Sequence, residues 1–457
     1  MITILTSHIG GAYKVDGKRL PGPIADKNGL LGKLKDIWPA DARVLMICAD
    51  PVDYEKNDSV LFCYKEVFPM SGLSVSSIGM CDARTEAPAE NISETDVIIL
   101  TGGHVPTQNA FFKKIGLREK LKGFEGILIA WSAGSMNCAD TVYAGPELEG
   151  EALDPAFKRW IPGLGLTRVN IFPHYEMLKD DILDGLKVIE DITYADSMGQ
   201  EILALNDGSY IVIEDGRTEL FGEAYSILDG EKEQICRDGE KRSISEMVLK
   251  MRQEIVDRSN RFVEQTKDSK DEYNIYREHI RHVYKYVVKL SEGKAVDREV
   301  LEISALLHDI AMTDMTLDRS RHNEYGADIA EQLLRENGYP EDKIRHVKNC
   351  ILNHSSRRAE FRTTEEEQIL VNADGLSHFD AYKSLYSLAH RVMGLNDEDS
   401  LKFIQDKLTK DYNELSDELK YLVSDIYSNI MKAGTIREII NSPADKKGDS
   451  SYDHGNI

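Results

Sequence analysis

Long apolar segments are missing from this sequence of 457 residues: no run of 18 or more consecutive apolar residues occurs in it. A helix that crosses a membrane needs about 20 such residues, so we expect no helical membrane span. The opening residues, "MITILTSHIGG", also lack the charged start and long apolar core of a secretory signal peptide. We therefore expect a globular protein of the cytoplasm.

Positive charge is also scarce, since 56 Lys and Arg stand against 79 Asp and Glu, for a net charge of −23. A nucleic-acid or anionic-membrane binder needs a positive surface, so neither partner is expected. A small anionic substrate in a locally basic pocket is compatible with this charge. We expect small-molecule substrates, and the sequence leaves open a homo-oligomer.

Paired cysteines are absent as well. The six cysteines are scattered, and no two of them form a CxxC pair that would indicate zinc. In a chain of this length they are typical of reduced, mostly buried thiols in a cytosolic protein.

Residues 1–240 alternate short apolar runs with helical stretches. The runs in 43–50, 96–103 and 126–134 are almost continuously apolar, as in strands that are buried on both faces of a parallel sheet. The segment 209–232 has short strands separated by turns, which predicts an antiparallel hairpin or meander. The first part of the chain is therefore predicted to be an α/β domain with a mainly parallel sheet flanked by helices.

The pattern changes near residue 240, beyond which helical spacing of apolar residues replaces the strand signals. We predict a linker helix over 241–270 and an all-α domain over 271–435. The polar, Gly- and Ser-rich tail, 436–457, is predicted to be disordered.

One predicted strand runs directly into a serine, in "ILIAWSAGSMN" (127–137). A nucleophile elbow needs small residues two positions before and after the serine, and Ala130 and Gly134 stand there around Ser132. The alternative is an ordinary strand-to-helix turn that needs small side chains. Two further features favour the elbow.

The run "DVIILTGGHVPTQ" ends in two glycines, so the N–H groups of Gly103 and Ala133 are candidate donors to an oxyanion. The segment "NIFPHYE" places His174 after a short apolar run, where it could act as general base, although a lone histidine could equally be a surface residue.

The ordered motifs GG, WSAG and PHY resemble peptidase family S51, which includes dipeptidase E and cyanophycinase and has the class I glutamine amidotransferase-like fold. The resemblance covers roughly residues 1–235 and implies Ser132 as nucleophile, His174 as base and no cofactor. It also implies a triad acid a short way beyond the serine, in "GPELEGE". Glu147 is the best match there, with Glu149 and Asp140 as alternatives.

Histidines gather in the second half. His279 shares a helical face with apolar residues, the adjacent His308 and Asp309 end "LEISALLHDIA", and Asp374 lies in "LVNADGL". Each of these alone could be a hydrogen-bonded core residue, but a metal would also satisfy an imidazole on an apolar face.

Together these elements resemble the HD metal-dependent phosphohydrolase superfamily over roughly residues 270–385. The resemblance implies that His279, His308, Asp309 and Asp374 bind a divalent metal. Such mixed imidazole and carboxylate ligands suit Fe, Mn, Co or Zn.

Other residues near these motifs are weaker candidates. His322 and His354 match positions where some HD proteins add a second metal or bind phosphate, but they could be solvated loop histidines. Arg357 and Arg358 could supply charge to a substrate phosphate. The remaining histidines of this region are taken as structural or surface residues: His282, His346 and His378.

The two resemblances predict a two-domain hydrolase. The first domain would be a serine peptidase for small or aspartyl peptides, and the second a phosphohydrolase for a nucleotide or other small phosphoester. In one alternative only the HD domain is catalytic and the first domain regulates it or senses a ligand. In another, both sites are idle and the chain is a binding or signalling protein.

Overall fold

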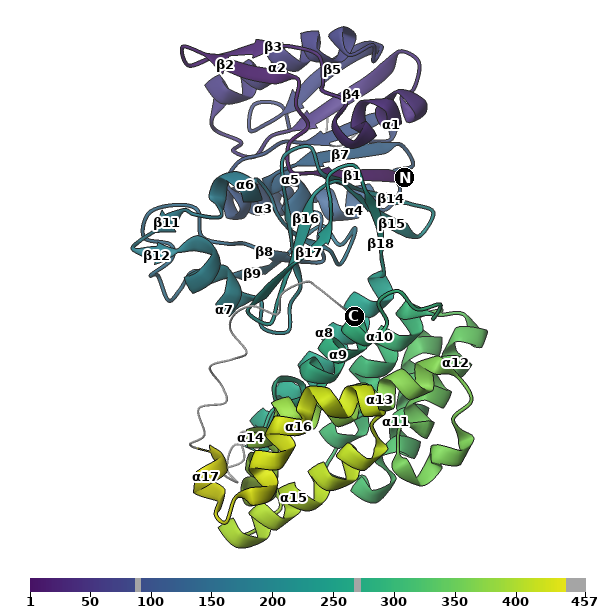
Figure 1. The fold of residues 1–457 in the computed structure, drawn as a ribbon. Helices are drawn as coiled ribbons and strands as arrows, with labels where there is room; N and C mark the ends of the chain where they lie inside the picture. Colours follow the sequence, from purple (N-terminus) through teal and green to yellow (C-terminus); the bar gives the residue numbers. More distant parts are fainter. Residues whose placement is uncertain (87–91, 267–272, 441–457) are drawn as a thin grey trace. The chain divides into compact units, whose positions relative to one another are not determined.

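Strands and helices are distributed unequally along the chain (Figure 1). The computed structural model describes residues 1–86, 92–266 and 273–440, which divide into an N-terminal unit, Met1–Leu249, and a C-terminal unit that begins at Lys250. Beyond Ile244 the described residues form helices and loops without strands. In the described ranges no helix is both long and apolar enough to cross a membrane.

The N-terminal unit is built on a mixed sheet of eight strands. Strands β1, β7, β6, β4 and β5 run parallel, and the antiparallel strands β14, β15 and β18 extend the sheet on the other side of β1. Strands β6 and β7 are fully buried, as expected for a parallel sheet that is covered on both faces. In spatial order the strands are β18 Lys241–Ile244, β15 Arg217–Phe221, β14 Tyr210–Glu214, β1 Ile2–Thr6, β7 Ile127–Trp131, β6 Val97–Leu100, β4 Ala42–Ile47 and β5 Val75–Cys81.

A second, four-stranded sheet in the same unit brings distant parts of the chain beside one another. Its strands in spatial order are β10 Asn170–Phe172, β13 Ile202–Leu205, β16 Ala224–Leu228 and β17 Glu231–Cys236. Three small hairpins complete the described strands: β2 Ala12–Val15 with β3 Lys18–Pro21, β8 Thr141–Tyr143 with β9 Trp160–Pro162, and β11 Ile182–Leu183 with β12 Leu186–Lys187.

Short helices follow several strands of the N-terminal unit. The turns between these elements matter for the site, because α3 follows β6, α5 follows β7 and α6 follows β10. The helices are α1 Leu30–Ile37, α2 Tyr54–Met70, α3 Val105–Lys114, α4 Leu117–Leu121, α5 Ala133–Met136, α6 Tyr175–Leu178 and α7 Tyr194–Asp196.

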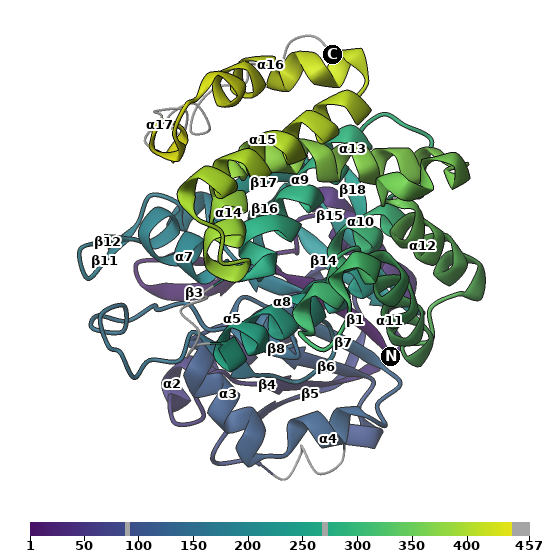
Figure 2. The ribbon, with the colours of Figure 1, turned by 90° about the horizontal axis from the view of Figure 1, so that it is seen from below.

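The C-terminal unit is a helical domain around α13. Helix α13 begins with a capping box between Thr364 and Glu367, and Leu370, Ala373 and Leu376 along it are fully buried. Helices α9, α12, α15 and α16 pack against it (Figure 2). The helices are α8 Glu246–Thr266, α9 Arg281–Leu290, α10 Arg298–Leu307, α11 His322–Glu336, α12 Glu341–Asn353, α13 Glu365–Asp380, α14 Tyr382–Ser387, α15 Asp397–Glu414, α16 Asp417–Lys432 and α17 Ile436–Ile440.

The fold class is confirmed, an α/β unit followed by an all-α unit, but three details differ from the predictions. Residues 241–244 are not part of a linker helix: they form β18, whose Ile244 pairs with Thr218 of β15. The meander of 209–232 is divided between the two sheets, since β14 and β15 join the large sheet and β16 and β17 the small one.

The predicted disordered tail, 436–457, begins with an ordered helix. Ile436 and Ile439 of α17 are buried in the apolar cluster formed with α15 and α16, which explains why this short segment is helical. The rest of the predicted tail, 441–457, and the end of the predicted linker, 267–270, lie outside the described residues.

Candidate functional sites

Ser132 stands in a sharp turn between β7 and α5. Its φ of 51° and ψ of −123° lie in a region that L-residues rarely adopt, so the turn is strained. The Ser132 N–H donates to the carbonyls of Thr6 and Ser7, at 3.1 Å each, which ties the turn to the end of β1. This strained strand-to-helix turn is the geometry expected of a nucleophile elbow.

Close backbone approach explains the small residues around Ser132. A Cβ on Gly134 would lie only 2.4 Å from the carbonyl oxygen of Leu100 in β6, so no larger residue fits there. A Cβ on Gly102 would lie 3.0 Å from the Cβ of Ser132, so the loop after β6 touches the elbow. The glycine pattern of the sequence therefore has a steric cause at both positions.

The two predicted oxyanion donors lie just beyond the ends of two adjacent strands. Leu100 of β6 is the register partner of Ala130 of β7, and Gly103 and Ala133 each follow three residues later. Ala133 is the first residue of α5, where a helix leaves its N–H without an intrahelical acceptor.

His174 is joined to the elbow through Ser7. The Ser7 carbonyl accepts from the Ser132 N–H at 3.1 Å, and the Ser7 hydroxyl accepts from the His174 N–H at 2.7 Å. His174 itself has a φ of 56°, so His174, like Ser132, is held in a strained backbone conformation. Ser7 thereby holds both residues at the end of β1.

The prediction that Glu147 orients His174 is wrong, because the acid on the imidazole is Asp207. Asp207 Oδ1 lies 2.7 Å from His174 Nδ1 and also accepts from the Ser7 hydroxyl at 2.7 Å. Burial raises the pKa of Asp207, but these two hydrogen bonds outweigh it and hold the pKa below its ordinary value. Asp207 thus stays ionised and can fix the ring.

Glu147 occupies a different environment. Its N–H and that of Leu148 donate to one oxygen of Glu151, whose other oxygen lies 3.0 Å from His104 Nε2. The residue is reached by solvent, yet protein atoms surround its carboxyl, and this desolvation together with the Glu151 charge raises the pKa of Glu147 to about 7. The other predicted acids are not on His174 either: Asp140 pairs with Arg118 at 2.8 Å, and Glu149 is exposed.

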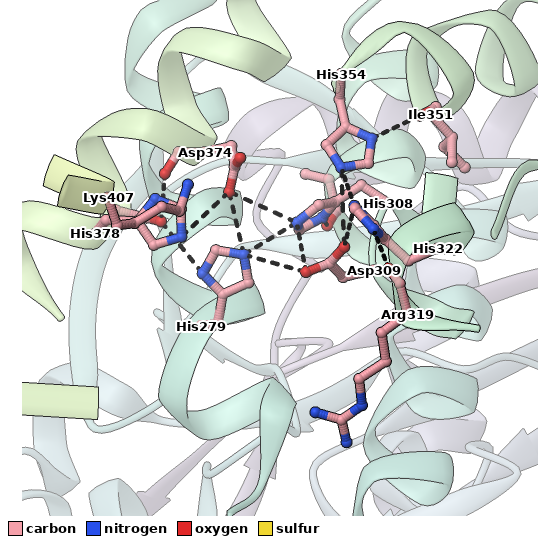
Figure 3. A network of polar contacts seen from close by, with 12 residues as sticks. His279, His308, Asp309, Arg319, His322, Ile351, His354, Asp374, His378 and Lys407 are labelled. Carbon is pink, nitrogen blue, oxygen red and sulfur yellow. Dashed lines mark hydrogen bonds and ion pairs between the residues drawn. The ribbon is translucent and has the colours of Figure 1, made fainter. Parts of the chain in front are cut away.

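The second site lies inside the C-terminal unit, where residues from separate helices converge (Figure 3). His279 comes from the helical turn Tyr276–Ile280 before α9, His308 and Asp309 directly follow α10, and Asp374 lies in the middle of α13. His279 Nε2 is 3.1 Å from His308 Nε2, 3.2 Å from Asp374 Oδ1 and 3.6 Å from Asp309 Oδ2.

The other oxygen of Asp309 faces a second group. His322, the first residue of α11, places Nε2 at 3.6 Å from Asp309 Oδ1, and His354, at the end of α12, places Nε2 at 3.8 Å. The two Nε2 atoms are 3.2 Å apart. Asp309 is therefore shared between two clusters of potential ligands.

Hydrogen bonds fix which nitrogen of each imidazole faces the cluster. His308, His322 and His354 each direct Nδ1 to a backbone carbonyl, those of Ala305, Arg319 and Ile351. His279 Nδ1 faces the hydroxyl of Ser377, which itself donates to the Asp374 carbonyl and can accept a proton from Nδ1. In that tautomer all four Nε2 atoms are acceptors.

A cation can satisfy acceptors that face one another. Asp309 Oδ1 is buried without a hydrogen-bond partner among the described residues, and the His279 and His308 Nε2 atoms lie 3.1 Å apart. Burial lowers the pKa of His308, and burial with the neighbouring His308 ring lowers that of His354 to about 4, so both rings are neutral at pH 7. This donor set fits a divalent metal.

His378, predicted to be structural or on the surface, is instead at the site. Its ring stacks on that of His279 with centroids 4.9 Å apart, and its Nε2 is 3.8 Å from Asp374 Oδ1. Its spacing of four residues from Asp374 on one helix could have revealed it. His282 and His346 remain outside the cluster, and burial lowers the pKa of His282 to about 3.

A pocket opens onto these residues. His322, His354 and Asp374 line it, together with Lys407 and Asp411 of α15. The predicted phosphate ligands Arg357 and Arg358 do not line it, which corrects their assignment to this pocket.

Arg358 is engaged elsewhere, because its Nε donates to Asn353 Oδ1 at 3.0 Å and its guanidinium lies 4.6 Å from the Phe361 ring centre. Arg357 is exposed to solvent. Lysines of α15, rather than these arginines, therefore provide the positive charge at the pocket: Lys407 and Lys410.

Comparison with known proteins finds one family model that matches in each part of the chain. Residues 43–221 match Peptidase family S51, and residues 276–379 match the HD domain. The first match includes Ser132, His174 and Asp207 but not Ser7. The second includes the histidines and aspartates of its site from His279 to His378.

Individual relatives are distant. A protein of uncharacterized function from Clostridium beijerinckii is 26% identical over 91 residues, which are 20% of this chain and 55% of that protein, so the chain spans about half the length of the curated relative it matches.

Two solved structures are similar to one half each. A predicted HD superfamily hydrolase from an uncultured Thermotogales bacterium has 22% identity and a TM-score of 0.25, over 38% of this chain and 91% of that one. A peptidase E protein from Listeria monocytogenes has 13% identity and a TM-score of 0.32, over 51% of this chain and 98% of that one.

Proposed function

Starting from a two-domain hydrolase with a peptidase S51 domain and an HD domain, we propose that the HD domain is a metal-dependent phosphohydrolase for a nucleotide or another small phosphoester. One observation carries this proposal: four imidazole acceptors and two carboxylates converge around Asp309, whose buried Oδ1 has no protein partner in the described part of the chain. A divalent cation would satisfy all of these acceptors at once.

Two metal positions are compatible with the ligands. His279, His308, Asp309 and Asp374 would hold one ion, and Asp309, His322 and His354 a second. Fe, Mn, Co and Zn suit the mixed nitrogen and oxygen donors. When bound, such ions polarise a phosphoryl oxygen and lower the pKa of a water molecule.

The chain's own residues prepare the site for this chemistry. The carbonyls of Ala305, Arg319 and Ile351 hold three imidazoles in the tautomer that presents Nε2, and the Ser377 hydroxyl does so for His279. The pocket beside His322, His354 and Asp374 leaves room for a small ester.

For the peptidase S51 domain we propose a serine hydrolase that acts on small or aspartyl peptides. Ser132 would attack the peptide carbonyl, His174 would take the hydroxyl proton, and Asp207 would hold the imidazole and stabilise its charged form. The N–H groups of Gly103 and Ala133 would donate to the developing oxyanion. The strained elbow at Ser132 supports this assignment.

A second candidate function is that only the HD domain is catalytic and the peptidase S51 domain senses a ligand. It is favoured by one observation: among the described residues, no hydrogen bond joins the Ser132 hydroxyl to His174. Catalytic hydrogen bonds can lengthen without substrate, so we rank this candidate second.

The test measures metal content and hydrolysis on the same purified chain. The metal-replete protein is offered a panel of phosphoesters and a panel of small peptides that includes aspartyl dipeptides. Metal with phosphoester turnover supports the first proposal, and peptide turnover that disappears in Ser132→Ala supports the second. A chain that holds no metal after metal-replete purification contradicts the first.

We also propose that the protein works in the cytoplasm on small molecules. The support is its chemistry: all six cysteines are free, buried thiols, as expected in a reducing compartment. The net charge of −23 disfavours a nucleic-acid or membrane partner.

A further inference from the structure

We propose that Lys407 of α15 binds the phosphate of the ester at the metal site, so that a helix outside the HD match completes the active site. This inference rests on the phosphohydrolase function proposed above. The HD match ends at residue 379, whereas α15 spans Asp397–Glu414. The assignment replaces the two arginines that the sequence suggested.

Position is the first support. Lys407 lines the same pocket as the ligands His322, His354 and Asp374, and Figure 3 shows its side chain beside Asp374. The two helices are close at this point: a Cβ on Gly375 of α13 would be in ordinary van der Waals contact with the Cβ of Asp411 on α15, at 3.8 Å.

A chain of contacts orients the Lys407 ammonium from the metal side. His378 Nε2 is 3.8 Å from Asp374 Oδ1, and His378 Nδ1 is 3.0 Å from Asp411 Oδ2. The other oxygen of Asp411 lies 2.9 Å from Lys407 Nζ. Asp411 and His378 are largely buried, so their geometry is fixed by packing and connects Lys407 to the proposed ligand set.

The ammonium has donors to spare. Lysine carries three N–H donors, and among the described residues Lys407 Nζ donates to one acceptor, Asp411 Oδ1. Its side chain is 29% exposed, so a ligand in the pocket can reach it. A partly desolvated ammonium that is held by a neighbouring carboxylate and faces a pocket is suited to bind phosphate oxygen as a point charge.

The local charges leave room for an anion. Asp309 and Asp374 contribute two negative charges, those of Asp411 and Glu414 are cancelled by Lys407 and Lys410, and one or two divalent ions would leave a neutral or positive pocket. A phosphate oxygen that the metal does not bind would then find Lys407 as its nearest fixed cation. Lys410, also at the pocket but exposed, adds a weaker and more screened charge.

The experiment compares Lys407→Gln and Lys407→Arg with the wild type in the metal-reconstituted full chain. The probe is inorganic phosphate, followed by its effect on the Tm and by its inhibition of phosphoester turnover. Lys402→Gln is the matched control, because Lys402 is exposed on the same helix and does not line the pocket. Metal content is measured for every variant.

We expect Lys407→Gln to bind phosphate about 10- to 100-fold more weakly and to raise KM by a similar factor, because it loses a charge-assisted hydrogen bond. Its metal content should equal that of the wild type, and kcat should change less than KM. Lys407→Arg should bind phosphate better than Lys407→Gln, and Lys402→Gln should match the wild type.

Two results would overturn the proposal: phosphate binding by Lys407→Gln within about twofold of the wild type, or a loss of metal from this variant, which would make Lys407 a support of the ligand set. Failure of the phosphohydrolase function is a separate result, seen when the metal-loaded wild type turns over no phosphoester. The Tm measurement with inorganic phosphate still decides the role of Lys407 in that case.

Discussion

The two units of this chain hold clusters of polar groups together in different ways. In the N-terminal unit the polar groups satisfy one another: His174 is bound to Asp207, and Ser7 joins both to the Ser132 turn. In the C-terminal unit the groups face each other as acceptors, and Asp309 Oδ1 has no partner in the described residues.

This difference separates a site whose histidine and acid already pair with each other from one whose acceptors would be satisfied by an added cation. Forming the serine site costs free energy because Ser132 and His174 adopt strained backbone conformations. Forming the histidine site costs free energy because buried acceptors lack partners, and metal binding would lower that cost. Each unit can therefore be disabled by a change that leaves the other intact, and the following predictions use that independence.

The largest expected effect is that of Ser132→Ala on peptide hydrolysis. Removing the nucleophile should lower kcat by about 10⁶-fold, as in other serine triads, while phosphoester turnover and metal content stay unchanged. Peptidase assays of wild type and variant, with phosphatase assays on the same samples, provide the measurement. Retained peptide turnover in Ser132→Ala would remove the serine mechanism altogether.

Asp207→Asn should lower kcat for peptides by about 10⁴-fold, because the amide no longer stabilises the charged imidazole and favours the wrong tautomer. Glu147→Gln is the comparison, since it also replaces a nearby acid but leaves the ring partner in place. Steady-state kinetics of both variants decide the matter. A larger decrease of kcat in Glu147→Gln than in Asp207→Asn would show that Glu147 orients the imidazole.

Asp309→Ala should remove the metal and lower phosphoester turnover by at least about 100-fold, because one carboxylate serves both ligand clusters. Peptide hydrolysis should not change. Elemental analysis of the variant is compared with that of Asp417→Asn, whose carboxylate is fully exposed on α16. Equal metal in Asp309→Ala and wild type would refute the metal site.

Ser377→Ala should have a smaller effect on the same site. The hydroxyl 3.3 Å from His279 Nδ1 orients this imidazole, and loss of such an outer contact should weaken metal binding about 10-fold. Competition with a metal chelator gives the affinity, and Ser424→Ala on α16 is the control. An unchanged affinity would show that packing alone orients His279.

The smallest predicted effect concerns stability and pH. With its pKa raised from 4.5 to about 7, Glu147 keeps a proton in the folded chain that the unfolded chain loses, so its contribution to stability falls as the pH rises through this window. Between about pH 5 and about pH 8 the Tm of Glu147→Gln should therefore fall less than the Tm of the wild type, by on the order of 1 °C. Identical Tm profiles would contradict the raised pKa.

The fold and part of each site were predictable because their signals are local. Apolar runs marked the buried strands, and the small residues around Ser132 reflect the 2.4 Å approach that a Cβ on Gly134 would make to Leu100. The doublet of His308 and Asp309 is adjacent in sequence and therefore visible. Such features need no knowledge of the tertiary structure.

The residues that were missed act across long distances. Asp207 is one of 79 acidic residues and lies in a turn between β13 and β14, so nothing local connects it to His174. Ser7 acts partly through its backbone carbonyl, which any residue possesses. Lys407 is an ordinary helix lysine until α15 packs against α13 and brings it to the pocket.

The role of Ser7 at the end of β1 has a consequence for the order in which the protein can fold. Strand β1 is the first strand to be synthesised, yet its two neighbours are β7 and β14, at 127–131 and 210–214. The hydrogen bonds from Ser7 to His174 and Asp207 span 167 and 200 residues of sequence. In a growing chain β1 therefore stays unpaired until β7 and β14 have been synthesised. The serine site can form only after nearly half of the protein has left the ribosome.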